Sequence, residues 1–86
     1  MHTHEIAAFY KFQRVADPVD LRKRLHAICE KAGARGILLV AKEGINGTLA
    51  VESGGIADLI DAIKREAGIV ELTPRFSFDD EMPFLR

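Results

Sequence analysis

The chain has 86 residues, of which 48% are apolar and 29% charged, and its formal net charge at pH 7 is −1. This length predicts a single domain, residues 1–86, and a near-neutral charge excludes a general electrostatic attraction to nucleic acid or membranes. The single cysteine, Cys29, excludes an internal disulfide and favours a reducing, cytoplasmic setting. We expect no signal peptide and no membrane segment, since no apolar run approaches the ~20 residues that span a bilayer.

The first half of the chain predicts a strand, a helix and a second strand. Residues 6–12 are apolar and aromatic, as in a strand. After a loop, Asp17 and Pro18 are a typical helix start, because the carboxylate accepts from free backbone N–H groups and proline has none to satisfy. Gly33 suits a left-handed cap. The continuous apolar run 37–41 predicts a central strand buried on both faces. The apolar face of the helix comprises Leu21, Leu25, Ile28, Cys29 and Ala32.

The second half predicts a hairpin, a helix and an edge strand. Residues 48–52 are the partner of the 37–41 strand, and Asn46-Gly47 favours a tight reversal within residues 42–47. Ser53 is the expected cap of the second helix, which ends at Gly68. Within the segment 69–78, Leu72, Pro74, Phe76 and Phe78 alternate with polar residues, which predicts an edge strand that tolerates the proline. The apolar stripe of the second helix comprises Ile56, Leu59, Ile60, Ile63 and Ala67.

The order β-α-β-β-α-β predicts an α+β fold of the ferredoxin-like (acylphosphatase-like) type, a sandwich with two helices on one face of a four-stranded antiparallel sheet. Both alternating sets of side chains in residues 37–41 are apolar, yet the helices cover only one face. The other face is therefore expected to carry an apolar patch, which marks an interaction surface. We expect this patch to dock against another domain or to support self-association with a second copy of the chain.

No side chain predicts catalysis. Cys29 lies on the apolar side of its helix, far from the helix N-terminus that would lower its pKa, so it is expected to be a small buried hydrophobe. The histidines, His2, His4 and His26, have no partners at metal-ligand spacing. We assign this chain no catalytic residue, no metal and no cofactor.

A basic cluster surrounds the first helix. Such residues bind RNA phosphates without reading the sequence of bases. The alternative is a solvated helix face balanced by nearby carboxylates. The candidate phosphate contacts are Lys11, Arg14, Arg22, Lys23 and Arg24.

Two other functions on the same βαββαβ plan are disfavoured by particular residues. An RNA-recognition module needs stacking aromatics on its third strand, and residues 48–52 contain none. The chain resembles acylphosphatases at Gly47-Thr48-Leu49 and in placing Arg14 in the first loop. However, residues 13–17 lack the glycine that lets backbone N–H groups cradle a phosphate, and they place Asp17 where the anion would sit.

Residues 35–50, centred on Glu43-Gly44-Ile45-Asn46-Gly47-Thr48, resemble a known family. They are similar to the Gly-x-Ile-Leu-Leu-Ala-x-Glu-Gly-Ile-Asn-Gly-Thr signature of the rhodanese-related tRNA uridine hydroxylases. The likeness extends to residues 10–12, 17–18, 29–30 and 83–86, and it therefore covers nearly the whole chain. Val40-Ala41 departs slightly from the signature.

The resemblance implies that the whole protein catalyses oxygen-dependent 5-hydroxylation of the wobble uridine of tRNA. This domain would be its non-catalytic N-terminal part, and the chain would continue beyond Arg86 into a rhodanese domain that holds the reactive cysteine. The implied partners are that domain and tRNA. A stand-alone binding or oligomerisation module, and thirdly an acylphosphatase-like hydrolase, are the alternatives.

The hairpin residues have a structural and a functional interpretation. In the structural one, Gly44 and Gly47 supply backbone conformations closed to other residues, and Asn46 bonds its own turn. In the functional one, Lys42, Glu43 and Asn46 are presented at the hairpin tip toward RNA or the following domain.

Overall fold

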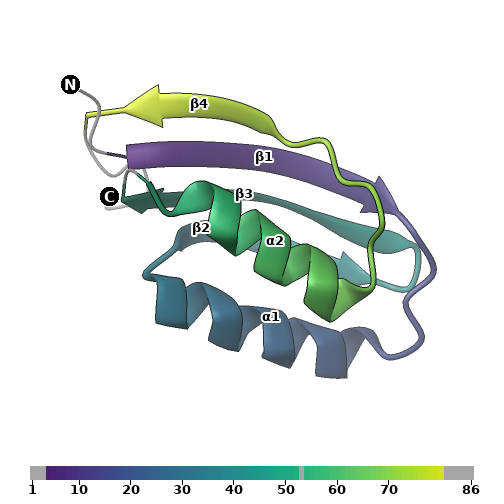
Figure 1. The fold of residues 1–86 in the computed structure, drawn as a ribbon. Helices are drawn as coiled ribbons and strands as arrows, with labels where there is room; N and C mark the ends of the chain where they lie inside the picture. Colours follow the sequence, from purple (N-terminus) through teal and green to yellow (C-terminus); the bar gives the residue numbers. More distant parts are fainter. Residues whose placement is uncertain (1–3, 53, 81–86) are drawn as a thin grey trace.

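The computed structural model describes residues 4–52 and 54–80. Four strands form one antiparallel sheet in the order β2-β3-β1-β4, and both helices lie against one face of it (Figure 1). The ferredoxin-like prediction is confirmed. In chain order the elements are β1 (His4–Phe12), α1 (Pro18–Ala32), β2 (Arg35–Ala41), β3 (Gly44–Glu52), α2 (Ile56–Ala67) and β4 (Arg75–Asp79).

Helix α1 begins and ends where the sequence predicts. The Asp17 side chain accepts a hydrogen bond of 3.1 Å from the backbone N–H of Asp20, and proline occupies the first helical position. At the other end, Gly33 adopts the left-handed conformation, with φ 71°. Its N–H donates to the carbonyl of Glu30 at 3.1 Å, which satisfies one of the carbonyls that a helix end leaves free.

The ends of α2, β1 and β4 differ partly from the prediction. Gly55 precedes the first residue of α2, so the expected cap by Ser53 is wrong, and Ser53 itself lies outside the described residues. Gly68 ends the helix as expected, with φ 67°. Strand β1 begins at His4, which places that histidine in the sheet. Strand β4 is an edge strand, as predicted, and begins directly after Pro74.

The β2–β3 turn lies earlier in the chain than the Asn-Gly signal predicts. Ala41 pairs with Gly44, which leaves Lys42 and Glu43 as a two-residue turn. Asn46 and Gly47 lie inside β3, and neither has a positive φ. The reason is the pairing of β3 with β1 along its full length, which extends the ladder back to Gly44 opposite Phe12. Those additional pairs prevail over the local turn preference.

Gly44 and Gly47 are required by the close approach of neighbouring strands. A Cβ on Gly44, whose φ is 153°, would lie 2.0 Å from the carbonyl oxygen of Lys11. A Cβ on Gly47 would lie 2.7 Å from the carbonyl oxygen of Ile37. The expectation of a special backbone conformation is therefore confirmed for Gly44 and wrong for Gly47. Gly47 is required only because there is no room for a Cβ atom at this position.

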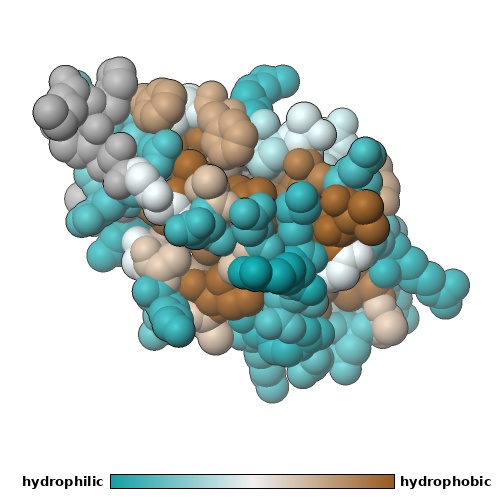
Figure 2. All heavy atoms as spheres, in the orientation of Figure 1, coloured by the Kyte–Doolittle hydropathy of each residue, from teal (hydrophilic) through white to brown (hydrophobic). Residues whose placement is uncertain are grey.

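The hydrophobic core lies between the sheet and the two helices. Leu25, Val51 and Ile63 are its largest fully buried side chains, one each from α1, β3 and α2. No polar side chain is buried among residues 4–52 and 54–80. Hydrophilic residues gather over the outward surfaces of the helices (Figure 2). The two helix stripes are confirmed, except that Ile28 and Ala67 are only partly buried and Ala32 is exposed.

Replacing Gly44 by alanine is expected to destabilise the domain by about 3 kcal/mol, because the positive φ and the steric clash add together. The matched control is Gly33→Ala, which also has a positive φ but has nothing within 4 Å of the new Cβ. That variant should lose only about 1 kcal/mol. Urea unfolding of both variants measures the difference, and equal losses would contradict the steric argument.

Candidate interaction face of the sheet

On the face of the sheet away from the helices, residues lie in rows that are in register across the strands, and three neighbouring rows form the candidate site. Paired residues of an antiparallel ladder point to the same side. Leu39, Asn46 and Tyr10 form the middle row. The flanking rows are Ala41, Gly44 and Phe12 on one side, and Ile37, Thr48, Ala8 and Arg75 on the other.

Large apolar side chains on this face are exposed. Their exposed fractions are 79% for Phe12, 70% for Tyr10, 58% for Ile37 and 56% for Leu39. The predicted apolar patch is therefore confirmed, although β2 is an edge strand and not the central strand that its sequence suggests. We call Tyr10, Phe12, Ile37, Leu39 and Asn46 together the open-face patch.

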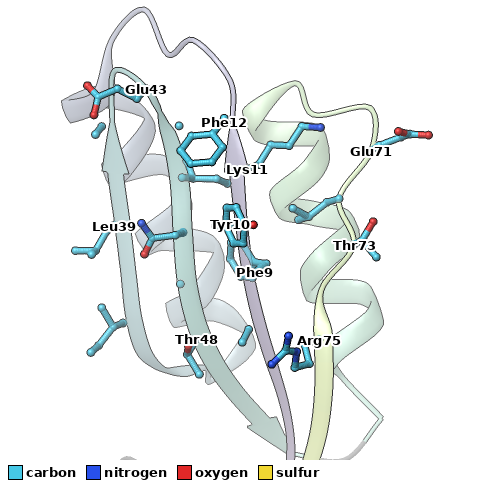
Figure 3. A pocket seen from close by; sticks show the side chains of 18 residues that line it. Phe9, Tyr10, Lys11, Phe12, Leu39, Glu43, Thr48, Glu71, Thr73 and Arg75 are labelled. Atoms are coloured by element: carbon cyan, nitrogen blue, oxygen red, sulfur yellow. The ribbon is translucent and has the colours of Figure 1, made fainter.

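The two aromatic rings of the open-face patch contact each other. Their centroids lie 5.5 Å apart with an angle of 72° between the ring planes. Figure 3 shows the Phe12 ring nearly face-on and the Tyr10 ring closer to edge-on. Both rings line an open concavity of about 1230 Å³, together with Asn46, Thr48 and Arg75. The concavity therefore combines aromatic surface with an amide and a guanidinium.

Sequence reasoning missed Tyr10 and Phe12. The test for an RNA-binding platform considered aromatics on the third strand alone, whereas these rings project from the first. The available signal was the run Phe9-Tyr10-Lys11-Phe12, because strand alternation sends Phe9 into the core and the other two rings to the opposite face.

The predicted docking residues of the hairpin divide between two places. Lys42 and Glu43 form the turn, and their side chains are exposed. Their carbonyl oxygens accept hydrogen bonds of 2.9 Å from the N–H groups of Val15 and Gln13, respectively, which ties the β1–α1 loop to the turn. Asn46 lies apart on the open face within β3, so the expected bond to its own turn is wrong. Glu43 and Asn46 line the same concavity.

The β1–α1 loop is not arranged as a phosphate cradle. The N–H groups of Gln13 and Val15 are already donated to the turn. The Gln13 amide also donates to the carbonyl oxygens of Ala67 and Gly68 at 3.2 Å each. These bonds fix the loop against the end of α2 and direct its donors into the protein. The geometry thus gives no support to acylphosphatase chemistry.

The basic residues do not form one continuous surface. Arg24 donates from Nε to Asp20 at 2.9 Å and pairs with Glu66 of α2. These hydrogen bonds, first to Glu66 and then to Asp20, raise the pKa of Arg24 above its ordinary value. Arg24 therefore links the two helices. Lys11 pairs in register with buried Ile45, on the helix side of β1.

Arg22 and Lys23 lie on a different side of α1. They line a shallow concavity between α1 and β2, together with His26 and Arg35. Glu30 also borders this concavity, with its carboxylate 3.4 Å from the His26 ring. Arg14 is exposed in the β1–α1 loop. Of the five predicted phosphate contacts, only Arg22 and Lys23 share a surface concavity away from the sheet face.

Cys29 is buried on α1, as predicted. Burial raises the pKa of its thiol, which keeps the sulfur protonated and poorly nucleophilic at neutral pH. Within residues 4–52 and 54–80, no three His, Cys, Asp or Glu side chains gather in an arrangement that would hold a metal ion. No helix in the described part of the chain is long and apolar enough to cross a membrane.

A four-stranded antiparallel sheet of this order, with both helices on one face, defines an acylphosphatase-like α+β domain. The chain belongs to the UPF0176 acylphosphatase-like domain family, whose model matches residues 4–86. It is 40% identical over all 86 residues to a tRNA uridine(34) hydroxylase of Caulobacter vibrioides (strain NA1000 / CB15N). Proteins of the same description match over 81 residues, with 42% identity in Gluconobacter oxydans (strain 621H) and 44% in Mesorhizobium japonicum (strain LMG 29417 / CECT 9101 / MAFF 303099).

The chain spans about a quarter of the length of these relatives. It covers 27% of the Caulobacter protein and 26% of each of the other two, and the matches include 94% to 100% of the chain. The similarity thus concerns one domain of a larger protein in each relative.

The burial of Cys29 predicts a pH dependence of stability. Because the pKa of the folded thiol is raised above its ordinary value of 9.0, the unfolded chain loses this proton first. The contribution to stability is complete below that value and is lost as the pH rises toward the folded pKa. The fall in unfolding free energy between about pH 8 and about pH 10 should be smaller in Cys29→Ala than in the parent chain. Urea unfolding measures both slopes, and identical slopes would refute the assignment.

Proposed function

We propose that this chain is the non-catalytic N-terminal domain of a cytoplasmic enzyme that hydroxylates the wobble uridine of tRNA, followed in the same polypeptide by a rhodanese domain. The observation that carries the proposal is the 40% identity, over the full 86 residues, with a protein described as a tRNA uridine(34) hydroxylase. The partners of the domain are tRNA and the remainder of the enzyme.

The chemistry of the described residues supports a non-catalytic role. Oxygen-dependent hydroxylation with a reactive cysteine needs an accessible thiolate, and Cys29 is buried with a raised pKa. The reacting groups then belong to the part of the enzyme outside this domain, and we assign no cofactor to the domain itself.

The hairpin tip supports a positioning role. Lys42 and Glu43 stabilise the fold through their backbone carbonyls, which accept hydrogen bonds from the β1–α1 loop. Their side chains remain exposed and are available to tRNA or to the rhodanese domain. Arg22 and Lys23, beside Arg35, offer a second contact for RNA phosphates along the groove between α1 and β2.

A chimera tests the proposed function directly. This chain replaces the matching 27% of the Caulobacter vibrioides hydroxylase, and the chimera is expressed in cells that lack the native enzyme. We expect 5-hydroxylated uridine to reappear in tRNA, as measured by mass spectrometry of its nucleosides. A chimera that accumulates as folded protein, yet leaves the wobble uridine unmodified, would refute the proposal.

The same chimera tests the hairpin tip. Combined Lys42→Ala and Glu43→Ala substitutions should lower hydroxylation roughly tenfold, the effect of losing about 1.4 kcal/mol of binding. The melting temperature should be unchanged, since both backbone carbonyls remain in place. The matched control is Asp61→Ala, which removes an exposed carboxylate from α2. Hydroxylation equal to that of the control would leave the hairpin with a purely structural role.

A further inference from the structure

The open-face patch has the chemistry of a site for a flat, polar, aromatic ligand. Phe12 pairs in register with Gly44, which has no side chain to cover the ring, and the Phe12 side chain is largely exposed. The Tyr10 ring contacts the Phe12 ring at a steep angle, so it would lie beside a base that stacks on Phe12. A nucleobase stacks on such a ring whatever its sequence, because every base has a π-face.

Asn46 adds hydrogen-bonding groups next to the rings. It pairs in register with Tyr10 on one side and Leu39 on the other, and its side chain is exposed. Its amide presents two donors and one acceptor. The edge of uracil offers carbonyl acceptors and an N–H donor, so one amide can satisfy a neighbouring pair of these groups.

The charged groups around the patch favour a nucleotide. In Figure 3 Arg75 extends from β4 toward β1, in the row next to that of Tyr10, where it can meet a backbone phosphate. Glu43 and Glu71 also line the concavity, but their side chains point away from the rings in the same view. Among the described residues that line the concavity, neither carboxylate therefore faces the rings on the Arg75 side.

The same residues argue against burial under another protein domain. Asn46 of the patch and the nearby Thr48 lie on β3, between β2 and β1, and each has apolar or aromatic residues on both sides. An apolar protein surface docked here would leave these polar groups without hydrogen-bond partners, which carries a desolvation penalty. A base supplies both the stacking surface and the missing donors and acceptors.

We infer that the open-face patch binds an unstacked base of single-stranded RNA, uracil in particular. The base stacks on Phe12 beside Tyr10, its polar edge meets the Asn46 amide, and Arg75 contacts a phosphate. This inference rests on the proposed function, because the loops of tRNA supply unstacked bases, and it names the subsite through which the domain would hold them.

The test uses the single tyrosine of the chain. Because the sequence contains one Tyr and no Trp, intrinsic fluorescence reports Tyr10 alone. Pentauridine RNA is titrated into the 86-residue chain, after a cooperative thermal melt has shown that it is folded. Stacking beside Tyr10 should quench the emission in a saturable way. With one phosphate contact on single-stranded RNA, binding should weaken only about threefold between about 50 mM and about 200 mM salt.

Substitutions on the two faces give matched controls. Phe12→Leu keeps apolar area but removes the π-face, and it should weaken binding by roughly 5- to 150-fold. Asn46→Ala should weaken binding by roughly 2- to 12-fold through loss of its hydrogen bonds. Phe76→Leu changes another exposed aromatic residue, which lies on the helix side of the sheet opposite buried Ala7, and should leave binding unchanged.

Three outcomes would overturn the inference. They are a folded chain whose emission pentauridine does not quench, equal weakening by Phe12→Leu and Phe76→Leu, and a dimer that is abolished by Phe12→Leu. The last would make this face an interface between copies of the chain. The result is separable from that of the chimera. If the chimera hydroxylates tRNA but the chain does not bind pentauridine, only the stacking site is refuted. If the chain binds pentauridine but the chimera does not hydroxylate tRNA, only the hydroxylase assignment is refuted.

Discussion

The alternation of side chains along the central strands β1 and β3 is the constraint on which the rest of the structure depends. Two helices can cover only one face of a four-stranded sheet, so each strand must send alternate residues into the core and the others outward. On β1, Ala7 and Phe9 enter the core, and Tyr10 and Phe12 face away from it. The same alternation of side chains therefore produces both the core and the candidate site, on opposite faces of the sheet.

The same pairing determines the geometry of the hairpin. Strand β3 follows β1 from Glu52 opposite His4 to Gly44 opposite Phe12, and this long ladder confines the turn to two residues. The strands approach closely enough that Gly44 has no room for a side chain. The turn carbonyls then fall within reach of the β1–α1 loop, which they anchor. A local turn signal is not needed to explain this arrangement, because the pairing of β3 with β1 accounts for it.

Much of the fold was predictable because it depends on local patterns. The Asp17-Pro18 start, the Gly33 end and the helical spacing of Leu21 and Leu25 each reflect chemistry within a few residues. The turn was misplaced because its position depends on pairing with β1, which is distant in sequence. The edge position of β2 was missed for a related reason. A continuous apolar run is typical of a central strand, and here it signals instead a strand whose second apolar face remains exposed.

The candidate site was harder to predict than the fold, since charge and aromaticity acquire meaning only once neighbours are known. Arg24 belongs to a run of three basic residues, yet its guanidinium is engaged by Asp20 and Glu66 and joins the helices. Tyr10 and Phe12 read as ordinary strand residues until their register with Asn46 and Gly44 is seen.

In the Glu43–Thr48 segment, the backbone and the exposed side chains have separate roles. The glycines and the turn carbonyls maintain the sheet and the loop, which is a purely structural requirement. The side chains of Glu43 and Asn46 make no contribution to the core, since both are exposed. The backbone of this segment and the buried side chain of Ile45 are committed to the fold, whereas the side chains of Glu43 and Asn46 are not. Those two side chains are therefore held on a rigid support. Rigid presentation lowers the entropic cost of binding, which is the property that a recognition surface requires.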